Sequence, residues 1–182
     1  MIGWILLGLG IVLVLFIIGF YNSLIRLRNE VQNAFAQIDV QLKRRNDLIP
    51  NLIETVKGYM KHEKETLENI TKARSAIMTA SSVEAKAKAS NMMSDTLKSL
   101  FAVAENYPKL VANENFIQLQ EELTGTENKV AYSRQFYNDS VLRFNTRIQT
   151  FPGSIFASMM NFKEELQFTA SEQERKNVNV KF

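Results

Sequence analysis

The sequence predicts an all-α protein in which an N-terminal transmembrane helix continues directly into a long antiparallel helical bundle of three long rods and a short C-terminal helix. Three observations favour this class. Of 182 residues only 7 are glycine and 3 are proline, so helices meet few of the residues that interrupt them. Residues 2–20 are almost entirely apolar. Beyond them, apolar residues alternate at spacings of four and three, the pattern of a helical bundle or coiled coil.

The first element is a predicted membrane anchor over residues 1–21. It carries no charged side chain, and about 20 apolar residues in a helix span the roughly 30 Å hydrocarbon layer of a bilayer. Trp4 and Tyr21 are expected at the two membrane interfaces, where aromatic side chains gather. A cleaved signal peptide is the competing interpretation, but the segment lacks a preceding Lys or Arg and a small-residue cleavage site. We therefore expect the segment to be retained.

Charge sets the expected orientation of this single-pass anchor. The first basic residues all follow the apolar segment, and they are Arg26, Arg28, Lys43, Arg44 and Arg45. Because basic residues are enriched on the cytoplasmic side of a membrane, we expect the N-terminus outside the cell and the C-terminal domain in the cytoplasm.

A first rod is predicted over residues 22–59, continuous with the anchor because no helix breaker separates Phe20 from Leu24. Two heptad series mark its inner face: Leu24, Val31, Ile38, Arg45, Leu52 and Tyr59, and Arg28, Phe35, Leu42, Ile49 and Val56. Pro50 lacks a backbone donor, so it is expected to kink the helix near Asn46 without ending it. The break is expected at residues 58–62.

A second helical stretch is predicted over residues 62–105. Its expected inner residues are Leu67, Ile70, Ile77, Met93, Leu97, Leu100 and Ala104. Few apolar residues occupy positions 79–84, where Ser81 and Glu84 have the spacing of a capping box. The stretch is therefore either one interrupted rod or two helices that turn back near Ser81, and the pattern leaves both open.

The third rod is predicted over residues 113–150, with Asn113 as its N-cap. Aromatic and aliphatic residues recur in it at every seventh position: Phe116, Leu123, Val130, Tyr137, Phe144 and Phe151. The sequence Phe151-Pro152-Gly153 is expected to end it, and residues 155–168 to add a short closing helix. The bundle domain is thus predicted over 22–170, followed by an extended polar tail over 171–182.

Rods of similar length joined by short loops are expected to run up, down and up. This arrangement returns the loop at Tyr107-Pro108 to the membrane surface beside Tyr21. It also directs the turn at residues 151–153 away from the membrane, with the closing helix over that far end.

Composition argues against several classes of function. The chain has no cysteine and one histidine, so neither a thiolate site nor a two-histidine metal site can form; His62-Glu63 begins an HExxH-like pattern that Thr66 breaks. A packed heptad bundle also offers no cleft for a carboxylate pair. The net charge of +3 is dispersed rather than gathered on a basic face. We expect no enzyme activity, no cofactor, no metal and no nucleic-acid binding.

Arg45 is unusual because it occupies an inner heptad position. One interpretation is that its side chain extends past the seam to water. The other is a buried polar layer that fixes the register of the rods. Counting along the rods from the membrane places Arg45 level with Ile77 and with Tyr137-Asn138, which makes Arg45 and Asn138 the candidate register residues.

Residues 34–59, AFAQIDVQLKRRNDLIPNLIETVKGY, resemble the signature of the LemA family. Further matching positions are Asn106-Tyr107-Pro108, Leu119-Gln120, Glu127-Asn128, Arg134, Tyr137-Asn138, Asn145-Thr146 and Phe151-Pro152. The resemblance covers nearly all of the chain after Tyr21. It implies a bacterial membrane protein with a helical-bundle domain, in a family with no agreed enzymatic activity. The sequence departs from the family at residues 162–168, a loose version of an aromatic- and proline-containing tail.

These observations favour a membrane-anchored helical scaffold that acts by association. Its expected partners are the lipid bilayer, further copies of itself in a homo-oligomer, or another membrane protein. An apolar seam longer than a compact domain needs motivates this hypothesis. The alternative is a regulatory or adaptor subunit of a membrane protease or of a signalling enzyme such as a kinase.

Overall fold

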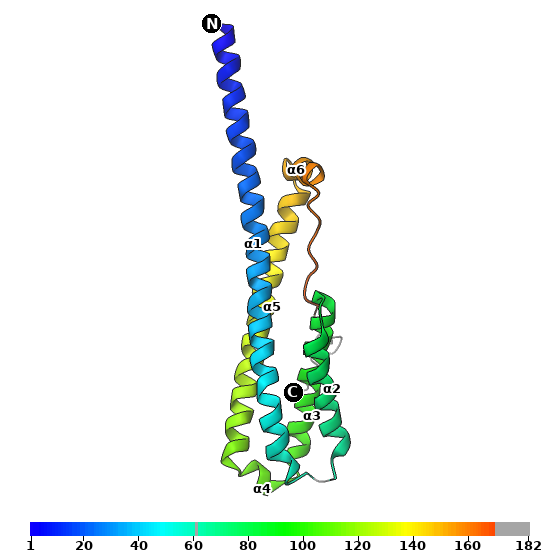
Figure 1. Cartoon of the computed structure of the whole chain (residues 1–182). Helices are drawn as coiled ribbons and strands as arrows, with labels where there is room; N and C mark the ends of the chain where they lie inside the picture. Colours follow the sequence, from blue (N-terminus) through cyan, green and yellow to red (C-terminus); the bar gives the residue numbers. More distant parts are fainter. Residues whose placement is uncertain (61, 170–182) are drawn as a thin grey trace, which may run out of the picture.

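The computed structural model describes residues 1–60 and 62–169, which form helices and connecting segments and contain no strand. Six helices follow one another in the order α1 (Ile2–Lys57), α2 (Lys64–Thr79), α3 (Val83–Ala104), α4 (Pro108–Val111), α5 (Glu114–Gln149) and α6 (Gly153–Met160). Figure 1 shows an elongated bundle from which the N-terminal part of α1 projects. The predicted all-α class is confirmed. The predicted tail over 171–182 lies outside the described residues.

Helix α1 is a single helix of 56 residues that contains Pro50 without ending there. Its length is about 84 Å at 1.5 Å per residue. An apolar window at its N-terminal end is long and apolar enough to cross a membrane, and none of it is buried against the rest of the chain. Burial begins at Phe20 and Leu24. The projecting apolar segment therefore passes into the bundle within one helix, as predicted.

The second helical stretch is a hairpin of α2 and α3, which lie side by side. Ser82, one residue later than expected, caps α3, because its Oγ accepts a hydrogen bond of 3.1 Å from the Ala85 amide. The backbone is extended at Ala80 and at Ser82, which allows the reversal between the two helices. Of the two open alternatives, the structure thus has the one in which the chain turns back.

This additional reversal corrects the predicted topology. We call the end of the bundle beside residues 2–20 proximal and the opposite end distal. The loop at α4 lies at the distal end, and the turn at residues 151–153 lies at the proximal end together with α6 (Figure 1). The expectations that Tyr107 returns to the membrane surface and that the 151–153 turn points away from it are therefore both wrong.

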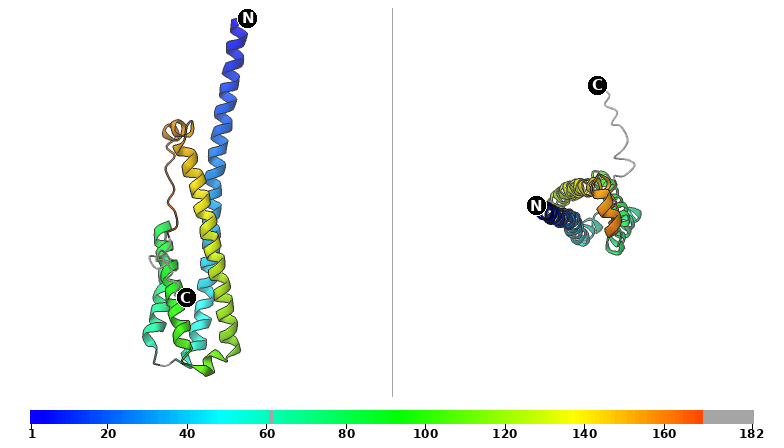
Figure 2. Two further views of the ribbon diagram at one scale, coloured as in Figure 1. Left: turned by 180° about the vertical axis from the view of Figure 1, so that it is seen from behind. Right: turned by 90° about the horizontal axis from the view of Figure 1, so that it is seen from above.

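The two halves of the bundle are built differently. In the distal half α1 and α5 pack with the α2–α3 hairpin, whereas the proximal half consists of α1, α5, α6 and the extended residues 161–169 (Figure 2). We call residues 161–169 the strap. The predicted closing helix over 155–168 is shorter than expected because Asn161, with φ 55°, adopts the left-handed conformation that commonly ends helices.

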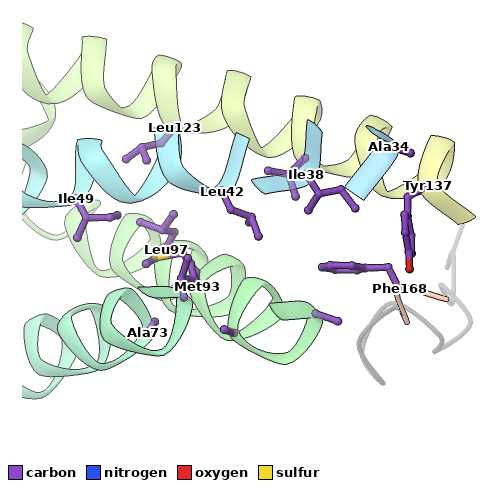
Figure 3. Close-up of a cluster of buried hydrophobic side chains, with 14 of the residues drawn as sticks. Ala34, Ile38, Leu42, Ile49, Ala73, Met93, Leu97, Leu123, Tyr137 and Phe168 are labelled. Atoms are coloured by element: carbon purple, nitrogen blue, oxygen red, sulfur yellow. The ribbon is translucent and has the colours of Figure 1, made fainter. Parts of the chain in front are cut away.

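Most of the predicted heptad positions form the core (Figure 3), whereas Arg28 is exposed. Two aromatic residues in the series are nevertheless exposed: Tyr59 and Phe151. Each lies beyond the end of its helix, since α1 ends at Lys57 and α5 at Gln149, and Met60 is buried just after Tyr59. The long seam of α1 is covered by the chain's own helices, mainly by α5. Its length therefore does not by itself require a second copy.

Candidate functional site

Arg45 is fully buried, with 0% of the residue exposed. Its Nη2 donates hydrogen bonds of 3.1 Å to both the carbonyl and the Oγ of Ser90, and its Nη1 donates one of 3.1 Å to Ser94 Oγ. Nη1 also forms an ion pair with Glu127. These four residues, the Arg45 cluster, join α1, α3 and α5 in one polar layer. Arg45 therefore lies in a buried polar layer and does not extend to water; that this layer fixes the register of the rods stays a prediction.

Burial sets the electrostatics of the Arg45 cluster. Loss of hydration lowers the pKa of the Arg45 guanidinium, and the negative charge of Glu127 opposes this effect. The hydroxyl of Ser94 lies 2.7 Å from Glu127 Oε1, so it can bridge the two charged groups. Because a guanidinium presents five donors in a rigid plane, this set of partners fixes its orientation. The Glu127 side chain is 34% exposed, so the cluster reaches water at one edge.

The predicted partners of Arg45 were wrong. Tyr137 is level with Phe35, whose ring centroid lies 5.6 Å away, and Phe35 precedes Arg45 by ten residues of α1, or about 15 Å. The expected level of Tyr137 and Asn138 assumes that the third rod starts at the membrane, whereas α5 starts at the distal end. Nor does Ile77 contribute to the polar layer, because α3 rather than α2 supplies its serines.

Asn138, the other register candidate, holds the strap rather than a neighbouring rod. Its Nδ2 donates to the Phe168 carbonyl at 3.0 Å, and its Oδ1 accepts from the Phe168 amide at 2.8 Å. Asn145 makes the same pair of bonds with Glu165, at 2.8 and 2.9 Å. Seven residues of helix and three residues of extended chain both measure about 10 Å, so the two asparagines match the strap's repeat.

Tyr137 adds a third link between α5 and the strap. Its hydroxyl donates a hydrogen bond of 2.8 Å to the Leu166 carbonyl. Desolvation, assisted by the charge of Glu165, raises the pKa of Tyr137 to about 12. The buried ring of Phe168 closes the core beside Tyr137 (Figure 3). The strap thus takes the place that the α2–α3 hairpin occupies in the distal half.

Sequence reasoning missed Glu127, Ser90, Ser94 and Asn145. Two signals could have identified some of them. Ser90 and Ser94 are four residues apart on the same face as Met93 and Leu97, so they are polar residues on an inner face. Asn145 follows Asn138 by seven residues and therefore lies on the same side of α5. Glu127 and Asn145 are among the positions that match the LemA family, but this match assigns them no role, and no local pattern separates Glu127 from the exposed carboxylates of this helix.

The three predicted interface residues do not lie together. Trp4 and Tyr21 are both exposed and lie at opposite ends of the projecting apolar segment of α1. Tyr107 lies at the distal end, where its hydroxyl is 3.2 Å from Glu63 Oε1. Desolvation and the hydrogen bond to Glu63 raise its pKa. Tyr107 therefore contributes to the distal loops rather than to a membrane interface.

Within residues 1–60 and 62–169 no group of three His, Cys, Asp or Glu side chains is placed to hold a metal ion. The open grooves on this part of the chain are lined by mixed polar and apolar side chains on neighbouring helix faces. One of them brings Ser94 beside Glu127, but both side chains also bind the Arg45 guanidinium. The absence of enzyme activity stays a prediction.

Comparison with known proteins agrees with the sequence resemblance. The sequence model of the LemA family matches residues 34–182. A relative from Metamycoplasma hominis, named Protein LemA, is 30% identical over 168 residues, which cover 90% of this chain and 75% of the relative.

Proposed function

This chain belongs to the LemA family, and on that premise we propose that it is a membrane-anchored, non-catalytic scaffold whose helical bundle stands in the cytoplasm and binds other proteins. The observation that carries the proposal is the continuity of α1, which joins an uncovered apolar segment to a packed bundle in one helix. A helix without a break transmits the orientation of the anchor to the bundle. The distal end then stands about 55 Å from the membrane, the length of residues 21–57.

The outer surface supplies the binding face, because the heptad seam is already occupied by the chain's own helices. Outward-facing apolar side chains are available on both long helices, notably Val40 on α1 and Tyr132 on α5, which is 72% exposed. Single exposed apolar residues are ordinary on protein surfaces. They nevertheless define where a crosslinking group can be placed without disturbing the core.

Photo-crosslinking from Tyr132 in intact cells tests the proposal. A photoreactive amino acid replaces Tyr132, and the same replacement at Met78, which is also exposed but lies on α2, serves as the matched control. We expect the protein in the membrane fraction and a discrete adduct from position 132. An adduct of twice the mass identifies self-association, whereas an adduct with one other membrane protein identifies an adaptor of a protease or signalling enzyme. If neither position yields an adduct and the detergent-extracted protein is a monomer, the scaffold proposal is wrong.

A further inference from the structure

We infer that α6 is a second membrane contact: a short helix that lies in the plane of the bilayer interface and inserts Phe151, Ile155 and Met159 among the lipids. The inference rests on the proposed membrane anchoring of α1. It assigns a role to a part of the bundle that belongs to neither the Arg45 cluster nor the strap.

Contacts with Phe20 place α6 at the level of the membrane surface. The ring of Phe156 stacks on Phe20, with centroids 4.9 Å apart, and Phe20 is the last residue of the long apolar run. Gly153 permits this close approach, because a Cβ at that position would lie 1.8 Å from the Arg147 carbonyl oxygen and 3.3 Å from Phe20 Cζ. The turn after α5 therefore brings α6 against the end of the span.

The exposed face of α6 is apolar. Ile155 and Met159 lie four residues apart on α6 and are 52% and 77% exposed, and Phe151, in the turn just before the helix, is 82% exposed. The opposite face, with Phe156 and Ala157, packs against the bundle. No charged residue occurs from Ile148 to Phe162. Transfer of such a stripe from water into the acyl region of a bilayer lowers the free energy.

The direction of α6 suits a membrane surface. Seen from above, along the long axis of the bundle, α6 is visible along its length, whereas α1 and α5 are seen close to end-on (Figure 2). The helix thus lies across the end of the bundle. When α1 stands along the membrane normal, α6 lies near the membrane plane, as interfacial helices do.

Basic side chains lie immediately below the apolar stripe. The Arg147 guanidinium lies 4.4 Å from the centroid of the Phe20 ring, and that of Arg28 lies 5.9 Å from the Phe162 ring. Arg26 is exposed on α1 at a similar level. Positive charge just beneath an apolar stripe matches the phosphates of a bilayer, which lie outside the acyl region. The continuity of the stripe with the span favours lipid as its occupant over a second protein.

Fluorescence quenching in lipid nanodiscs tests the inference on the full chain. The protein contains no cysteine, so Met159→Cys can be labelled alone with an environment-sensitive fluorophore. Met78→Cys, near the distal hairpin's tip and 67% exposed, is the aqueous control, and Leu7→Cys in the apolar segment is the control for the span. The discs contain phosphatidylcholine and phosphatidylglycerol, with either a spin-labelled lipid or iodide in the buffer as quencher.

We expect the spin-labelled lipid to quench the labels at 159 and 7 strongly, and iodide to quench the label at 159 at least threefold less than that at 78. Equal iodide quenching at 159 and 78, with the label at 7 still quenched by lipid, overturns the role of α6 but leaves the anchor intact. Failure of lipid quenching at position 7 overturns the proposed anchoring itself. A label at 159 that neither quencher reaches shows that protein covers the stripe, which also overturns the assignment to lipid.

Discussion

The distal and proximal halves of the bundle cover the inner faces of α1 and α5 in different ways. In the distal half the inner faces of α1 and α5 are covered by the α2–α3 hairpin, and a buried arginine ties α1, α3 and α5 together. In the proximal half no third long helix is present among the described residues, and an extended strap bound by asparagine side chains covers the core instead. An extended chain cannot satisfy its own backbone groups, so α5 supplies amide side chains that do so.

The largest expected change in the free energy of unfolding comes from the Arg45 cluster, which is in the distal half. Glu127→Leu leaves a buried guanidinium without its counter-charge and should lower the free energy of unfolding by about 3 kcal/mol, near the lower end for a broken buried pair because Glu127 is partly exposed. Denaturant unfolding of the protein in mild detergent measures the loss.

A double variant tests whether the stability lost in Glu127→Leu comes from the unpaired charge of Arg45 or from the changed packing. Arg45→Leu combined with Glu127→Leu removes both charges and should recover most of the stability lost in Glu127→Leu. If the double variant is as unstable as Glu127→Leu, the uncompensated charge is not the cause. If Glu127→Leu unfolds at the wild-type midpoint, the cluster does not stabilise the distal half at all.

The asparagine pair is the corresponding test of the proximal half. Asn138→Ala removes both hydrogen bonds to Phe168 and should destabilise the strap by about 1–2 kcal/mol. Hydrogen exchange at the Phe168 and Glu165 amides reports the change directly, and exchange in the α2–α3 hairpin should stay at its wild-type rate. Asn128→Ala, an exposed position on the same helix, is the control and should leave strap exchange unchanged.

The hairpin that distinguishes the distal half depends on its turn. Ser82→Ala removes the N-cap of α3 and should lower the free energy of unfolding by about 1 kcal/mol. Ser81→Ala is the matched control, because it changes the neighbouring serine without removing the cap. Thermal unfolding followed by circular dichroism compares them, and equal melting temperatures for the two variants would contradict the assigned cap.

The smallest expected effect is the dependence on alkaline pH that Tyr137 gives to the proximal half. Because folding raises the pKa of Tyr137 from its usual value near 10 to about 12, its contribution to stability is complete below pH 10 and is lost as the pH rises through 12. Tyr137→Phe should cost about 0.5–1 kcal/mol at neutral pH, through the lost bond to Leu166.

Comparing the wild type with Tyr137→Phe separates the titration of Tyr137 from that of the other tyrosines. The stability difference between the wild type and Tyr137→Phe should be constant up to about pH 9 and shrink between pH 10 and 12. Urea unfolding across this range measures it, and a difference that stays constant to pH 12 would show that the hydroxyl does not titrate with folding.

The sequence by itself determined the local structure. Helix-forming composition, the apolar run of residues 2–20 and the heptads of α1 and α5 identified the class, the projecting segment and most buried positions, because each depends on residues within a few turns of one another. Asn113 was correctly identified as an N-cap for the same reason. The two aromatic positions that failed, Tyr59 and Phe151, lie just beyond helix ends, where a heptad count no longer describes a face.

Only the tertiary structure decided which faces meet. A periodicity specifies that one side of a helix is buried but not which helix covers it, so the reversal at residues 80–82 changed the ends at which Tyr107 and α6 lie. The tertiary structure also pairs Arg45 with Glu127, 82 residues away in the chain. Which helix faces pack together, and which residue pairs with Arg45, depends on loop geometry and long-range packing. The free energy of each such contact depends on both partners, so neither segment determines it alone.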